Sequence, residues 1–244
     1  MAPFTPSTTQ PAVPRDIGLF EWLFDPDTWT GRSGVLSSLL DTLTLSSAVI
    51  ATAVLAAVPL ATILAHYRKG ELTLTWLVTL SRAVPTFAVA GLLVPVALKQ
   101  GWGFEPWPIF IALLLLALPP IYLNTYTSVR YVDQGVVDAA RAMGFREREI
   151  LLRVELALAM TVVLTGVRVA AVQVVATEPI RAFLGGDGLG RYIRDGLGQN
   201  NDTLVVGGAM LVTALALATG LVFTVLERVI LSRGIQRLKT VSKR

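Results

Sequence analysis

Three stretches of 24 residues without a charged side chain, 42–65, 106–129 and 203–226, most constrain how this chain can fold. A helix needs about 20 apolar residues to cross the roughly 30 Å hydrocarbon core of a bilayer. Two further apolar stretches, 72–98 and 156–177, are each interrupted by a single arginine. The sequence therefore predicts an all-α integral membrane protein with about five transmembrane helices.

The composition supports a membrane protein. Only 16% of the residues are charged, and 53% are hydrophobic. Soluble domains contain about 25% charged residues. Cysteine is absent, which excludes disulfide bonds and thiol chemistry.

Basic residues outside the spans predict the orientation of the chain. Placing 131–157 in the cytoplasm gathers thirteen Lys and Arg residues on that side and leaves six outside. The N-terminus is then outside and the C-terminus cytoplasmic. We divide the chain into an outer arm (1–34) with a possible interfacial helix, a transmembrane domain (35–232) and a basic tail (233–244). The tail is typical of a lipid-headgroup anchor, so we expect membrane lipid and no nucleic acid as its partner.

The segment 131–155 is predicted to form a cytoplasmic loop of two short helices. Asp133 can cap the first helix, apolar residues then recur at helical spacing, and Gly144 ends it. Ile150 and Val154 lead into the next span. The simplest alternative is an ordinary corner between two spans.

The loop resembles the EAA motif of ABC-importer permeases. Asp138-Ala139-Ala140 is followed by three residues, Gly144, nine residues and Val154-Glu155-Leu156, while Ala157 replaces the usual proline of the motif. The resemblance implies a type I ABC-importer permease whose loop docks on a cytoplasmic ATPase. The implied coupling residues are Asp138, Ala139, Ala140, Met143, Gly144, Phe145 and Arg146.

Six other segments are similar to the glycine betaine, choline and osmoprotectant branch: 84–95, 118–126, 166–170, 183–190, 201–203 and 226–228. This implies import of compatible solutes such as glycine betaine, choline or carnitine. An importer of another small solute, such as an amino acid, is the alternative. A secondary transporter is less favoured, because such proteins commonly contain paired repeats, and five spans without internal duplication do not fit them.

Energy for import has to come from another chain. No phosphate-binding G-x-x-x-x-G-K-[ST] loop is present, so we expect no cofactor here, and ATP and magnesium on a partner ATPase dimer. The resemblance also implies a second permease copy or paralogue, an extracytoplasmic substrate-binding protein, and a location in the inner or plasma membrane of a prokaryote.

Prolines and ionisable residues within the spans are candidates for the pathway or gate. Proline frees backbone carbonyls, which in a membrane have to face protein or a watery cavity. The candidates are Arg82, Pro85, Thr86, Pro95, Asn124 and Arg168. Static kinks and arginines that fix helix packing are the alternatives.

A glycine-rich segment after the fourth predicted charge-poor span, 184–190, is expected on the outer side. It lacks the lysine of a phosphate loop and is predicted to be a flexible turn before a short helix, 191–197. The candidate outer-gate residues are Gly185, Gly186, Gly188, Leu189 and Gly190. His66, the single histidine, lies at the inner end of the first span, where a headgroup contact is favoured over a proton relay.

Overall fold

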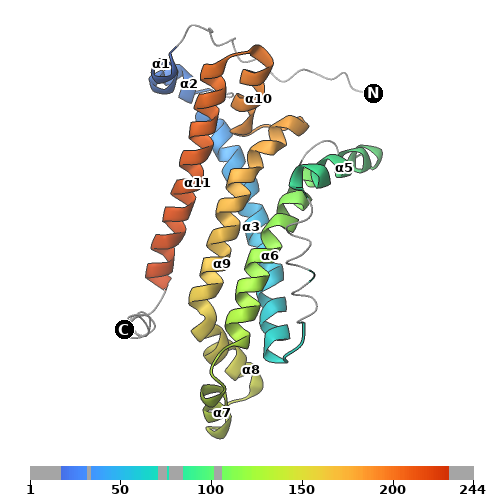
Figure 1. Cartoon of the computed structure of the whole chain (residues 1–244), viewed down its shortest axis with the longest axis vertical. Helices are drawn as coiled ribbons and strands as arrows, with labels where there is room; N and C mark the ends of the chain where they lie inside the picture. The colour runs from blue at the N-terminus through green and yellow to red at the C-terminus, as the bar shows by residue number, and fades with distance from the viewer. Residues whose placement is uncertain (1–17, 32–33, 71–75, 77–84, 102–105, 231–244) are drawn as a thin grey trace.

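A computed structural model describes residues 18–31, 34–70, 76, 85–101 and 106–230, and all regular elements in these ranges are helices (Figure 1). Four helical runs are long and apolar enough to cross a membrane. Their main helices are α3 (Val35–His66), α6 (Trp107–Arg130), α9 (Leu156–Thr177) and α11 (Asp202–Ile230). With 32 residues, α3 is about 48 Å long. Four of the five predicted spans are therefore confirmed.

The remaining predicted span, 72–98, lies partly outside the described residues. Its described part forms α5 (Thr86–Lys99), which has 14 residues and so is about 21 Å long. That length is less than the hydrocarbon thickness, so α5 accounts for only part of the predicted span. It packs on α6.

The core is formed where α3, α6 and α9 pack together. On α3 every fourth residue faces this core, and none of these five is more than 2% exposed: Val49, Ala53, Ala57, Ala61 and Ala65. Residues four apart lie on one face of a helix. Small side chains on that face let neighbouring helix backbones approach closely, which is how membrane helices gain packing energy.

A proline pair shapes the contact between α6 and α9. Pro119 and Pro120 lie inside α6, and the Asn124 amide donates to the Pro120 carbonyl at 2.7 Å. Gly166 of α9 faces this point, because a Cβ there would lie 2.7 Å from the Asn124 Cβ. The absence of a side chain at residue 166 therefore allows α9 to approach α6.

The last helix, α11, is the least buried of the long helices. Its most apolar 18-residue stretch contains no buried residue. It contacts α9 along one side and, near its first residues, α1 and α10. Leu217, Leu221 and Val222 are each at least 63% exposed. In the isolated chain, α11 thus presents a long apolar surface.

A helix, α1 (Leu19–Phe24), lies where an interfacial helix is predicted, and α2 (Pro26–Trp29) follows it. Phe20 and Phe24 are exposed. Trp22, in contrast, is buried against Tyr192 with an edge-to-face ring contact at 5.5 Å. A Cβ at Gly207 of α11 would overlap the Trp22 ring. Trp22 therefore ties the N-terminal helix to the bundle, a role that the sequence did not reveal.

The helical bundle has two structurally different ends (Figure 1). At one end lies the hairpin (residues 131–155), made of α7 (Gln134–Ala142), α8 (Glu147–Glu149) and the π-helix η1 (Ile150–Glu155). At the opposite end lie α1, α2 and α10 (Gly190–Gln199), with the 3-10 helix η2 (Glu178–Leu184) joining α9 to the loop before α10.

Candidate functional site

The hairpin has the helix–glycine–helix form that its sequence predicts. The Asp133 side chain caps α7 by accepting from the Gly135 amide at 2.7 Å. Gly144 has φ +83°, a left-handed conformation that glycine adopts without steric cost. The Gly144 amide donates to the Arg141 carbonyl and the Phe145 amide to the Ala140 carbonyl. This pair of hydrogen bonds is the Schellman motif, which ends a helix and turns the chain sharply.

The second arm of the hairpin continues without a break into α9. The Glu149 carboxylate accepts from the Arg146 amide at the start of α8. Residues 150–155 then form a π-helix before the regular α-helix begins. Single π-turns inside helices are rare and occur frequently at functional sites. The two arms share a small apolar core of Val132, Val137, Ala140 and Ile150, with Val154 packed against it.

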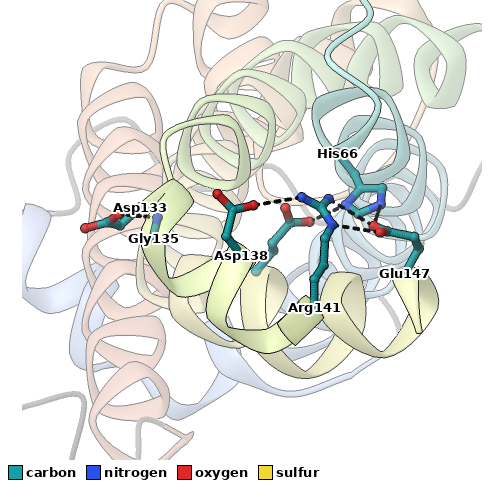
Figure 2. Close-up of polar contacts among 7 residues, drawn as sticks. His66, Asp133, Gly135, Asp138, Arg141 and Glu147 are labelled. Carbon is teal, nitrogen blue, oxygen red and sulfur yellow. Dashed lines mark hydrogen bonds and ion pairs between the residues drawn. The ribbon is translucent and has the colours of Figure 1, made fainter. Parts of the chain in front are cut away.

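Arg141 joins the two arms by charge. Its Nε and Nη2 donate to the two carboxylate oxygens of Glu147 at 2.8 and 3.1 Å, and its Nη1 donates to Asp138 at 3.1 Å (Figure 2). The hydrogen bond to Glu147 is the main cause that raises the pKa of Arg141 above its ordinary value. All three side chains are substantially exposed, so water and salt weaken these pairs.

His66 joins the hairpin to the end of α3. Its Nδ1 lies 2.6 Å from Glu155 Oε2 and its Nε2 lies 3.2 Å from Glu147 Oε2. The His66 side chain is only 4% exposed. The expected lipid-headgroup contact is therefore wrong, because two carboxylates of the hairpin enclose the ring. Figure 2 shows His66 beside Glu147 and Arg141.

The predicted coupling residues divide into a buried and an exposed group. Ala140 is buried in the hairpin core, whereas Met143 is 71% exposed and Phe145 37% exposed. Val136 is 44% exposed. The remaining predicted residues of the hairpin are also exposed: Asp138, Ala139, Gly144 and Arg146. The hairpin thus presents apolar side chains on a surface otherwise rich in charge.

The predicted outer-gate loop lies at the opposite end and is largely buried. Gly186, Gly188, Leu189 and Gly190 are buried, and Gly185, with φ +93°, ends η2. The Leu189 amide donates to the Thr42 hydroxyl at 3.0 Å. The expected flexible turn is therefore replaced by a loop that is fixed against α3 and η2.

A buried carboxylate anchors this loop. Glu178 is fully buried and accepts from Thr42 at 3.0 Å and from Arg181 at 3.2 Å. A Cβ at Gly188 would lie 2.8 Å from the Thr42 hydroxyl oxygen. At Gly190 a Cβ would overlap the Pro179 carbonyl. We call Thr42, Glu178, Arg181 and residues 188–190 the Glu178 cluster.

The predicted pathway residues lie at separate places. Pro85 directly precedes α5, and Thr86 and Pro95 lie within it. Asn124 lies in α6, facing Gly166 of α9. Arg168 donates to Thr224 of α11 at 3.1 Å and lies 3.9 Å from Glu227. It also lines a groove of about 610 Å³ between α9 and α11. Arg82 lies outside the described residues.

Comparison with known proteins identifies the family. The family described as "Binding-protein-dependent transport system inner membrane component" matches residues 53–237. The chain belongs to this family. It is a multi-pass membrane protein and a permease subunit, as the EAA-like motif predicts.

Several relatives are permeases of osmoprotectant transport systems. The choline transport system permease protein OpuBB of Bacillus subtilis (strain 168) is 32% identical over 87% of this chain and 96% of its own length. The glycine betaine/carnitine/choline transport system permease protein OpuCB of the same organism is 30% identical over 78% of this chain and 85% of its own length. The osmoprotectant import permease protein OsmW of Salmonella typhimurium is 27% identical over 84% of this chain and 96% of its own length.

Solved structures of the MetNI methionine ABC transporter, in inward-facing conformations, have a similar fold. One matched chain has a TM-score of 0.69 and 16% sequence identity, with 82% of this chain and 96% of that chain covered. At this identity the likeness concerns the fold alone, which is that of a type I ABC-importer permease.

Proposed function

We propose that this permease carries a quaternary-ammonium osmoprotectant, such as choline, glycine betaine or carnitine, across the membrane. The observation that supports this most is the similarity to OpuBB, which extends over 96% of that choline permease. The methionine transporter resembles this chain in fold at only 16% identity. An amino-acid cargo is therefore the weaker alternative.

The hairpin is the proposed docking element for a cytoplasmic ATPase, which would bind ATP and magnesium. Exposed Val136, Met143 and Phe145 support this proposal. Exposed apolar side chains clustered on a charged surface are typical of a site that a partner covers. The capped turn at Gly144 and the shared apolar core fix the two arms of the hairpin relative to each other. A displacement of the hairpin by the ATPase would therefore be passed on to α9.

The proposed docking of the hairpin on a cytoplasmic ATPase also implies how the chain is oriented in the membrane. The distribution of basic residues supports a cytoplasmic position for the hairpin. The loop 185–190 and α10 then face outward, where a substrate-binding protein would dock. The exposed apolar surface of α11 supports a second permease copy or a paralogue beside this one.

Reconstitution into liposomes with the ATPase and binding protein tests the cargo. We expect ATP-dependent uptake of radiolabelled choline, glycine betaine or carnitine, and none of methionine. Uptake of methionine but of none of these three compounds would contradict the proposed substrate class. ATP-independent uptake would exclude a mechanism coupled to the ATPase.

Capture of the ATPase by the permease tests the docking element. Ala140→Asp places a charge in the hairpin core, where Ala140 is 2% exposed, and is expected to abolish capture. Gly198→Asp, which adds the same charge at an exposed position of α10 with nothing within 4 Å of its Cβ, is the matched control and is expected to retain it. Equal capture by both variants would place the docking surface elsewhere.

A further inference from the structure

The environment of His66 suggests a charged contact that the coupling motif does not include. Both ring nitrogens face carboxylate oxygens, Nδ1 toward Glu155 at 2.6 Å and Nε2 toward Glu147 at 3.2 Å. An ionised carboxylate only accepts hydrogen bonds, and a neutral imidazole has a single N–H donor. The two contacts are satisfied together when both ring nitrogens carry protons, as in imidazolium.

The burial of this contact makes the charge important. The side chains of His66 and Glu155 are 4% and 7% exposed. An ionised carboxylate that is buried without a cationic partner is strongly unfavourable. Imidazolium therefore matches the negative charge of Glu155 inside the protein, while Glu147 is shared with Arg141.

The contact also spans the π-helix. Glu147 lies before η1 and Glu155 is its last residue, so His66 holds both sides of the six-residue π-helical segment against α3. A π-turn is a place where a helix deviates from regular geometry. Loss of one contact would let the hairpin turn about η1 relative to α3.

We propose that His66, in its imidazolium form, is a positioning residue that holds the coupling hairpin against the first span and makes coupling to the ATPase sensitive to cytoplasmic pH. The proposal rests on the proposed function of the hairpin. Deprotonation removes one of the two donors, so the hairpin is held more weakly as pH rises.

Neighbouring ionisable groups do not provide the same response. On the hairpin, Glu147 and Glu155 contact the ring, Arg141 pairs with Glu147, and Asp138 pairs with Arg141. From α3 and the turn that follows it come Tyr67, Arg68 and Lys69, and from α6, which packs on α3, Tyr122, Tyr126 and Arg130. Of these side-chain types, histidine is the one that ordinarily changes charge between pH 5 and 8.

Because the chain has one histidine, nitrogen-15 NMR of histidine-labelled permease reports on His66 alone. The permease is studied in nanodiscs with its ATPase, using an affinity tag without histidine. We expect both ring nitrogens of the wild-type protein to carry protons at pH 6.5, and Glu147→Gln, which removes one of the two acceptors, to have a larger fraction of neutral imidazole at the same pH. A neutral ring in the wild type at pH 6.5, or an equal neutral fraction in Glu147→Gln, would overturn the proposal.

Coupling is measured as the stimulation of ATPase activity by substrate and binding protein, from pH 6 to 8.5. We expect the stimulation to fall at least about fivefold relative to wild type in His66→Gln at pH 6.5. This deficit should shrink as pH rises and the wild-type ring loses its charge. His66→Lys, which stays charged and has three donors, should show a flatter profile than wild type.

The outcomes separate this proposal from the proposed function. If wild type shows no stimulation by any substrate tested, the proposed function fails first. If wild type is stimulated and His66→Gln has a pH-independent deficit, His66 is only structural and this inference alone fails. Should His66→Gln not assemble, Glu147→Gln, at a half-exposed position, carries the same test, with a smaller deficit that again shrinks as pH rises.

Discussion

The two ends of the bundle hold their carboxylates in opposite ways. Glu178 is fully buried and is bound by Thr42 and Arg181 beside closely packed glycines. Glu147 has a side chain that is 51% exposed and is bound by Arg141 and His66. Salt and water screen the second arrangement but have little access to the first.

This difference indicates a fixed end and an adjustable end. The Glu178 cluster joins α3, η2 and the loop before α10 through buried contacts. The hairpin is joined to α3 through His66, which makes one buried contact, with Glu155, and one contact with the half-exposed Glu147 that water, salt or a proton can replace. We therefore expect movement that enters through the hairpin to change its contacts with α3 before it changes those of the Glu178 cluster.

The largest effect is expected at Gly190, in the fixed end. A Cβ in Gly190→Ala would overlap the Pro179 carbonyl, and such overpacking against backbone costs about 3 kcal/mol or more. Thermal unfolding in nanodiscs should show a large loss of stability. Gly198→Ala is the matched control on the same helix, with nothing within 4 Å of its Cβ, and it should not destabilise the protein. Equal stability of the two variants would contradict the close packing.

The second-largest effect is a loss of stability at Glu178, which is compared with the same substitution at Glu147. Glu178→Gln removes the buried carboxylate charge that pairs with Arg181, which is 9% exposed, and breaking a buried pair costs about 3 kcal/mol. Glu147→Gln should leave the unfolding temperature unchanged within error while altering coupling. If the two variants destabilise the protein equally, the distinction between a fixed and an adjustable end is wrong.

A smaller effect is expected at Gly144, where a side chain has room but the backbone is left-handed. Nothing lies within 4 Å of a Cβ there, and φ is +83°. Gly144→Ala should therefore cost about 1 kcal/mol, and Gly144→Asn less, since asparagine adopts this conformation more readily. Affinity for the ATPase should fall in the same order. An alanine variant with higher affinity than the asparagine variant would contradict this turn geometry.

The smallest effect is expected for Arg141→Gln, which removes exposed ion pairs to Asp138 and Glu147. Such pairs are weak and screened by salt. Affinity for the ATPase should decrease slightly in low salt, and the difference from wild type should vanish at about 0.5 M salt. A large effect that persists in high salt would mean that Arg141 contacts the ATPase itself.

The sequence was sufficient for features that depend on local pattern. Three charge-free stretches and one interrupted by Arg168 predicted the four long helices, and Asp133 with Gly144 predicted the hairpin. Contacts between distant residues were not predictable. Thr42 and Glu178 are 136 residues apart, and His66 and Glu155 are 89 apart. Such pairs depend on how the helices pack, which no local pattern in one sequence specifies. For the His66 contacts, the available signal was a single histidine at the end of a span, together with the acidic residues Glu147 and Glu155 of the motif segment.

The most direct test of the account is a cysteine cross-link from the hairpin to the ATPase, because the chain has no cysteine of its own. Met143→Cys introduces a thiol at the C-terminal end of α7, where the native side chain is 71% exposed. Val137→Cys introduces one within α7, where the native side chain is 1% exposed. In the assembled complex, a short thiol-to-amine cross-linker should join residue 143 to the ATPase and leave residue 137 unlinked. A third variant, Gly198→Cys at the opposite end, should link only to the binding protein. Linkage of residue 198 to the ATPase, with none from residue 143, would contradict the assignment of the hairpin as the coupling element.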